Sequence, residues 1–195
     1  MNELGSTSEQ GLIYEDRLPL KWRPLDDEAS TLDMAKFEAM NEEVLRFIDV
    51  LDEHPNESTG DHSSLNQELA RVEVKFDLLL SLVSQLLGVY FPLPASVHVR
   101  LTPNGVQWLS PEALDVGAHG LLEIYMCSRC PRSLIFPAIV ERSGKDEDLY
   151  RVSAKFNGMS DPIRIRLEKM IFRHHRRGVA LARRRLMTDP KPPSA

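Results

Sequence analysis

A continuous apolar seam in residues 64–88 is the feature that most constrains the fold. Apolar side chains recur at alternating steps of four and three residues over about three heptads. Ser64 with Gln67 predicts an N-terminal capping box, and Gly88 predicts the end of a helix roughly 36 Å long. The seam consists of Leu69, Phe76 and Val83 at position a, and of Leu65, Val72, Leu79 and Leu86 at position d.

The positions beside this seam change character along the helix. They are polar in the first half, as at Glu68 and Lys75, and apolar in the second half, at Leu80, Leu82 and Leu87. A helix that is apolar over most of its circumference must be buried on several sides. Two interpretations remain open, a core helix within one subunit and a helix that self-associates. We favour self-association, and the widened seam favours a homotetramer over a dimer.

A second long helix is expected just before the seam, over residues 31–54. Pro55 ends it, and a polar loop at residues 55–63 follows. Two long helices joined by a short loop are expected to lie antiparallel, so residues 27–89 should form an inserted helical hairpin that drives oligomerisation. The apolar positions of the first helix are Phe37, Met40, Val44, Phe47 and Leu51.

After Gly88 the apolar period changes from that of a helix to that of a strand. Strands are expected at residues 97–101, 106–109, 120–127, 134–141 and 149–156, with another at 12–22 that Pro19 marks as an edge strand. Six short antiparallel strands are typical of a small barrel, and Asp161-Pro162 begins a C-terminal helix. We therefore expect an α+β fold, with barrel and C-terminal helix at 12–24 and 90–187, and flexible tails at 1–11 and 188–195.

The charge of the chain is divided between its halves. Residues 1–95 hold 7 Lys and Arg against 19 Asp and Glu, whereas residues 96–195 hold 17 against 10. Such an asymmetry suggests two modules, or complementary surfaces that meet in an assembly. Two cysteines, a polar N-terminus and no apolar run near 20 residues predict a cytoplasmic protein with no membrane span.

This order of elements resembles an atypical PilZ domain: one strand, an inserted helix pair, a five-strand run and an Arg-rich C-terminal helix. The resemblance implies a six-stranded barrel of the family that binds cyclic di-GMP in its typical form. It further implies a non-enzymatic adaptor in cyclic di-GMP-linked bacterial signalling, in processes such as type IV pilus motility or virulence. Its partners would be other copies of itself and signalling or pilus proteins.

The two ligand motifs of the typical family are degenerate in this chain. The first, R-x-x-x-R, corresponds to Arg17 and Lys21, and lysine does not replace arginine in bidentate or stacking contacts. The second, D/N-x-S-x-x-G, corresponds to Arg100, Thr102 and Gly105, where Arg100 turns an acceptor into a donor. Binding of cyclic di-GMP is therefore expected to be weak or absent, although a receptor with a non-standard site remains an alternative.

Other candidate chemistry is sparse in the sequence. Cys127 and Cys130 form a CxxC with only His119 nearby, so we interpret it as a hairpin turn rather than a zinc or redox site. His174 and His175 are adjacent, so they point to different faces of a helix and are read as part of a solvated basic surface. No catalytic arrangement or metal site is recognisable, and an enzyme is not expected.

The basic C-terminal helix supports a second class of function. Nine Lys and Arg residues lie between positions 164 and 185, including Arg183 to Arg185, against Glu168 alone. Such a helix can bind the phosphates of nucleic acid or lipid. It can also dock on the acidic helices of the same or a neighbouring chain, which is the interpretation that we favour.

Overall fold

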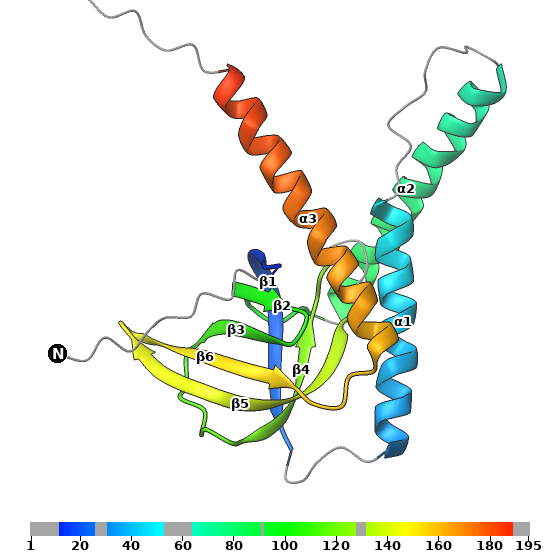
Figure 1. The fold of residues 1–195 in the computed structure, drawn as a ribbon. Coiled ribbons are helices and arrows are strands. Elements are labelled where there is room, and N and C mark those ends of the chain that lie inside the picture. Colours follow the sequence, from blue (N-terminus) through cyan, green and yellow to red (C-terminus); the bar gives the residue numbers. More distant parts are fainter. Residues whose placement is uncertain (1–11, 26–30, 53–63, 91, 128–131, 189–195) are drawn as a thin grey trace, which may run out of the picture.

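The fold is a closed six-stranded barrel with three helices (Figure 1). A computed structural model describes residues 12–25, 31–52, 64–90, 92–127 and 132–188. All neighbouring strands are antiparallel, in the order β1-β2-β3-β6-β5-β4. The strands are β1 (Tyr14–Pro24), β2 (Ser96–Thr102), β3 (Gly105–Ser110), β4 (His119–Ile124), β5 (Leu134–Asp146) and β6 (Leu149–Phe156); the helices are α1 (Thr31–Asp52), α2 (Ser64–Tyr90) and α3 (Asp161–Thr188).

Strand β1 closes the barrel because it pairs on both sides. Its first half pairs with β2 from Tyr14 to Pro19, and its second half pairs with β4 from Leu20 to Pro24. The expectation that Pro19 marks an edge strand is therefore wrong. Pro19, which has no backbone N–H to donate, lies where β1 changes partner, and its carbonyl accepts a hydrogen bond from the Tyr125 N–H at 3.0 Å.

The barrel core follows from the alternation of side chains along the strands. On β2 and β3, Val99, Leu101, Val106 and Trp108 are buried, while the residues between them are more exposed. The core continues into the helices, because α1 and α3 close one side of the barrel (Figure 1). The helical residues in the core are Val44, Leu45, Ile48, Ile163, Leu167, Met170 and Ile171.

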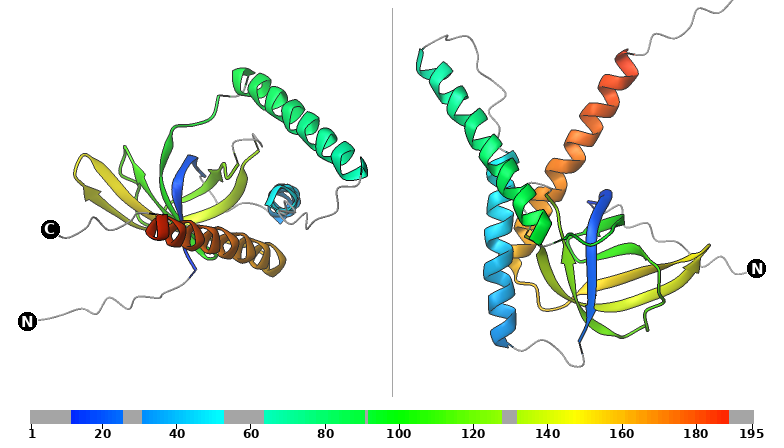
Figure 2. Two further views of the ribbon diagram at one scale, coloured as in Figure 1. Left: turned by 90° about the horizontal axis from the view of Figure 1, so that it is seen from above. Right: turned by 180° about the vertical axis from the view of Figure 1, so that it is seen from behind.

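Helix α1 packs on the barrel and on α3, and this differs from the expected pairing of α1 with α2. Its buried residues Val44, Leu45 and Ile48 belong to the same core as the barrel strands. Helix α2 instead diverges from the barrel, as does α3 on the other side, so that the two form a V (Figure 2). The apolar spacings of α1 and α2 are similar, but Val44, Leu45 and Ile48 of α1 pack in the barrel core.

Asn41 fixes α1 to the end of β5 through its buried side chain. Its Nδ2 donates to the Ile135 carbonyl at 2.8 Å, and its Oδ1 accepts from the Ile135 N–H at 2.7 Å. Ile135 pairs with Glu123 of β4 on one side, while the pairing of β5 with β6 starts only at Ala138. The Asn41 amide thus completes the ladder at a position that β6 does not reach.

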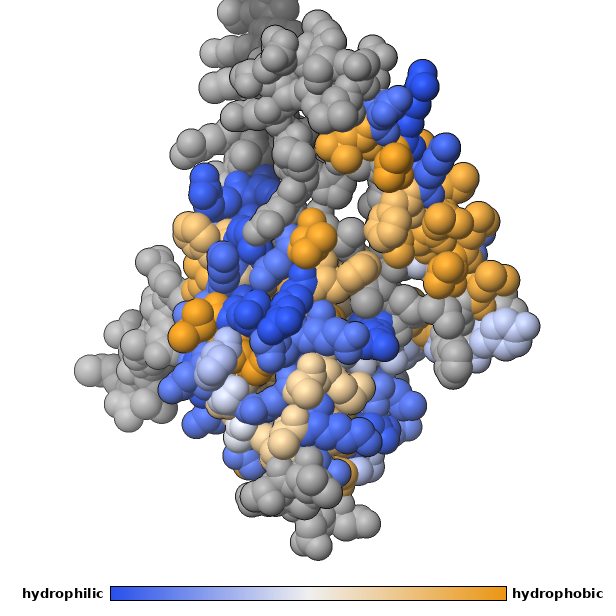
Figure 3. Space-filling view, turned by 90° about the vertical axis from the view of Figure 1, so that its right-hand side faces the viewer, coloured by the Kyte–Doolittle hydropathy of each residue, from blue (hydrophilic) through white to orange (hydrophobic). Residues whose placement is uncertain are grey.

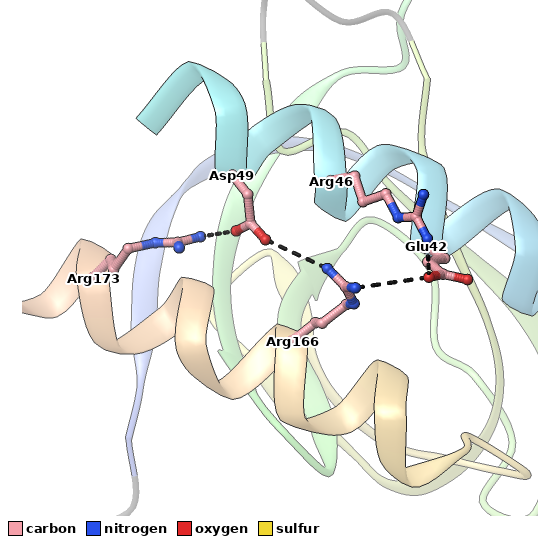
Figure 4. Close-up of polar contacts among 5 residues, drawn as sticks. All are labelled: Glu42, Arg46, Asp49, Arg166 and Arg173. Carbon is pink, nitrogen blue, oxygen red and sulfur yellow. Dashed lines mark hydrogen bonds and ion pairs between the residues drawn. The ribbon is translucent and has the colours of Figure 1, made fainter. Parts of the chain in front are cut away.

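Charged residues join α1 and α3 along one edge of their contact (Figure 4). Asp49 pairs with Arg173 and lies 3.6 Å from Arg166, which in turn lies 3.7 Å from Glu42. Glu42 also binds Arg46 at 2.7 Å. The predicted docking of the basic helix on an acidic helix is therefore confirmed for Arg166 and Arg173.

The two carboxylates of this network are expected to contribute unequally to stability. Asp49 and Arg173 expose only 20% and 21% of their side chains, so replacing Asp49 by Ala should lower the free energy of unfolding by about 2 kcal/mol. Glu42 is more exposed and its partner Arg46 is more exposed still, so Glu42→Ala should cost less than about 1 kcal/mol. Urea denaturation of both variants measures the difference, and equal losses would contradict this assignment.

Candidate functional site

The described part of the α2 seam, from Leu69 to Leu86, is exposed in the single chain. The six described seam side chains expose between 51% and 62% of their surface: Leu69, Val72, Phe76, Leu79, Val83 and Leu86. Leu65 lies in the helix, but its side chain is outside the described residues. In Figure 3 an apolar patch covers the part of the surface formed by α2. Between Leu69 and Leu86, neither α1 nor the barrel covers the seam.

Further apolar side chains widen the exposed surface of α2. Leu82 lies beside the seam at position g and is 48% exposed, whereas Val74 and Leu78 lie at positions f and c, away from the seam, and are 69% and 60% exposed. Tyr90 continues the seam at the next position a and is exposed as well. Exposed apolar patches of this extent are rare on monomeric proteins, and they mark sites of interaction. Among the described residues, α2 carries more exposed large apolar side chains than any other element.

The structure places the two candidate residues of the first ligand motif far apart. Arg17 pairs in register with His98 of β2, and its guanidinium donates to the Ser96 carbonyl at 3.2 Å. Lys21 pairs in register with Glu123 of β4. Lys21 follows Arg17 by four positions along the strand, a distance of roughly 13 Å between their Cα atoms. Arg17 therefore lies at the β2 side of β1 and Lys21 at its β4 side.

Lys21 lies beside a group of three polar residues, Arg23, Glu123 and Tyr125. Glu123 accepts from Arg23 at 2.7 Å, and the Tyr125 hydroxyl donates to Glu123 at 3.4 Å. Burial raises the pKa of Tyr125, and the negative charge of Glu123 raises this pKa further. Tyr125 is thus held as a neutral hydrogen-bond donor, and the Glu123 carboxylate already has a cationic partner.

The residues of the second motif lie at the β2–β3 turn and have internal partners. Thr102 Oγ1 accepts from the Gly105 N–H at 3.1 Å and lies 3.0 Å from the Gly105 carbonyl, to which it donates. A Cβ on Gly105 would collide with the Ala154 carbonyl of β6, so the glycine is required for strand packing. Arg100 binds Glu15 of β1 at 2.5 Å. Each of the three residues therefore has a structural role.

A shallow cavity of about 260 Å³ lies on the outer face of the barrel beside Arg100. Two of the residues around it are cations that already have carboxylate partners, Arg100 with Glu15 and Arg151 with Asp146. An anion would have to compete with these carboxylates. Arg151 and His98 were not singled out from the sequence, although their alternation with buried residues places them on the outer face. The cavity is lined by His98, Arg100, Gln107, Trp108, Leu109 and Arg151.

The remaining candidate residues lie apart from one another. Cys127 is a free thiol at the end of the described segment, and Cys130 lies outside the described residues. His174 is half-buried, and its ring packs on Tyr14 at 3.8 Å between ring centroids, which differs from the fully solvated histidine that was expected. His175 is exposed, in agreement with the expectation. Among the described residues, no group of three or more His, Cys, Asp or Glu is placed to hold a metal ion.

Comparison with known proteins identifies the family. The model of the family described as "Atypical PilZ domain, cyclic di-GMP receptor" matches residues 45–184, which is more than half of the chain. The chain belongs to the atypical PilZ family. The resemblance inferred from the order of strands and helices is thereby confirmed. No protein among the curated ones matches the chain.

A solved PilZ structure resembles this chain over most of its length. It is a pathogenic protein from Xanthomonas campestris, described as a new tetrameric PilZ domain self-assembled via an unusual helical bundle. The two chains are 27% identical, with a TM-score of 0.66, and the match covers 88% of this chain and 92% of the other. The barrel with its inserted helices is therefore shared with a protein that assembles as a tetramer.

Proposed function

We propose that this atypical PilZ protein is a non-enzymatic adaptor in cyclic di-GMP-linked signalling that self-assembles as a homotetramer through α2. The observation that carries the proposal is the seam of α2, which exposes more than half of each described side chain from Leu69 to Leu86. Fully burying such a side chain contributes roughly 1.5–3 kcal/mol. Six of them per chain therefore provide a large driving force for association, and the tetramer of the relative from Xanthomonas supports the stoichiometry.

An assembly of this kind would present several barrels at once. Partner proteins that bind one barrel weakly would gain affinity through multivalency, because the second contact becomes intramolecular. The outer face of the barrel, away from α1 and α3, is the surface available for such partners. Processes such as pilus motility or virulence are those in which we expect the adaptor to act.

Cyclic di-GMP is expected to bind weakly or not at all. The guanidinium of Arg100 is held by Glu15, Thr102 closes its own turn, and Lys21 lies at the β4 side of the barrel. A calorimetric titration of the full chain with cyclic di-GMP should show no binding below micromolar concentration. Light scattering at tens of micromolar should give about four times the 22.2 kDa chain mass, with or without the nucleotide.

A cyclic di-GMP receptor with a non-standard site is the second candidate function. The cavity between Arg100 and Arg151 favours it, because two guanidinium groups and His98 lie around one depression. Submicromolar binding that is lost in an Arg151→Ala variant would establish this alternative. The same result would contradict the proposal of a degenerate ligand site, while it would leave the assembly through α2 intact.

A further inference from the structure

Helix α3 has an apolar stripe on the side that faces away from the barrel. Ile165 and Phe172 are 62% and 47% exposed there, one heptad apart. At the same spacing the sequence continues with Val179 and Leu186, and α3 remains helical through both positions. The opposite side of α3 packs in the core through Ile163, Leu167, Met170 and Ile171.

Cationic side chains lie on the same side of α3 as this apolar stripe. Lys169 and Arg176 are exposed and lie four residues after Ile165 and Phe172 respectively, which places them on the same side of the helix. The Arg176 guanidinium carbon lies 5.9 Å from the centroid of the Phe172 ring. In the sequence from 162 to 188, nine Lys and Arg residues stand against Glu168 alone. The outer face of α3 is therefore both apolar and basic.

Not all of these cations are available to a partner. Arg166 and Arg173 face Asp49 of α1, and Arg164 donates to Asn104 at 3.1 Å. In the described part of the chain, no ion pair joins Lys169 or Arg176 of the outer side to α1 or to the barrel. Some basic residues of α3 therefore hold the helix to α1 and to the barrel, and others lie on its outer face.

We propose that the outer face of α3 docks on an anionic lipid surface, with the helix lying in the plane of the membrane. A basic helix with an apolar stripe binds this interface because acyl chains receive the stripe and acidic headgroups attract the cations. The barrel lies on the other side of α3, so it does not obstruct such a contact (Figures 1 and 2). In the described part of the chain, no helix is long and apolar enough to cross a membrane.

The stripe favours lipid over nucleic acid as the occupant. Phosphates of nucleic acid are bound by cationic and polar groups, and this contact needs no apolar side chains. Ile165 and Phe172 are exposed between the cations, and a lipid surface is the partner that offers both phosphate groups and hydrocarbon. The inference concerns α3 and does not depend on the assembly through α2.

Vesicle flotation of the full-length protein tests this inference. The protein should float with vesicles of equimolar phosphatidylcholine and phosphatidylglycerol, and should remain unbound with phosphatidylcholine alone. Raising the salt from about 0.1 M to about 1 M shortens the screening length from about 10 Å to about 3 Å, so it should weaken binding. Phe172→Glu should reduce binding at least about tenfold, because it removes apolar area and adds a repelled charge.

The matched control is Val116→Glu, which adds the same charge at an apolar side chain that is 67% exposed outside α3. This variant should bind vesicles within about twofold of the unmodified protein, since the added charge lies away from α3. Thermal unfolding and solution mass of both variants should match those of the unmodified protein. Absence of phosphatidylglycerol-dependent flotation, or equal losses in the two variants, would overturn the inference. So would binding to duplex DNA without binding to vesicles.

Discussion

Replacing Phe76 by Asp is expected to reduce the solution mass from about four times 22.2 kDa to the 22.2 kDa of one chain. Phe76 occupies the central position a of the seam, so the new carboxylate would have to be buried between helices at each copy. Removing an unpaired charge from water costs several kcal/mol per ion. The substitution also removes the apolar contacts that the Phe76 ring would make with the neighbouring helices. Light scattering at tens of micromolar measures the mass.

The control for this variant is Val116→Asp, which places the same carboxylate at an exposed apolar position between β3 and β4. It should keep the mass of the unmodified protein. The barrel should stay folded in both variants, because Phe76 is 60% exposed and lies outside the barrel core. A Phe76→Asp protein that keeps its full mass would show that α2 does not hold the assembly together.

Replacing Asn41 by Leu is expected to lower the free energy of unfolding by about 2–6 kcal/mol. The amide of Asn41 satisfies both the N–H and the carbonyl of Ile135, and Asn41 is only 2% exposed. Leu has a similar volume but cannot form either hydrogen bond, so two buried backbone groups lose their partner, at about 1–3 kcal/mol each. Chemical denaturation followed by circular dichroism measures the loss.

Lys36→Leu is the matched control, because it introduces the same side chain at an exposed position of α1. Its effect should stay within about 0.5 kcal/mol. If Asn41→Leu and Lys36→Leu have the same stability, the amide does not fix α1 to β5. The two variants should retain the mass of the unmodified protein under native conditions, since neither residue belongs to α2.

The barrel strands were predictable because each strand shows a pattern of alternating apolar and polar residues in its own sequence. The alternation of buried and exposed residues on β2, β3 and β6, and the Pro103-Asn104 turn between β2 and β3, are visible in the sequence. The prediction of an edge strand from Pro19 was wrong, because a strand can change its pairing partner at a proline without lying at the edge of a sheet. The order of strands in a closed barrel depends on pairing between segments that are far apart in the sequence. A local pattern of residues does not reveal that pairing.

The candidate site was only partly predictable for a similar reason. The seam of α2 is a local heptad pattern, and the structure leaves it exposed. The partner of α1 was missed, because the side chains of α1 fit a second α-helix and a barrel equally well by pattern alone. Ion pairs such as Arg100 with Glu15 and Arg173 with Asp49 join residues that are far apart in sequence, and only the folded register brings them together.

Hydrogen exchange of the α2 backbone amides in the unmodified protein tests the central claim most directly. If copies of the chain cover the seam, the amides of residues 69–86 should exchange slowly at tens of micromolar, and fast in the Phe76→Asp monomer. Slow exchange that disappears on dilution or on this substitution is the predicted result. Fast exchange of α2 in the concentrated, unmodified protein would contradict the account, because the helix would then be solvent-exposed in every state of the molecule.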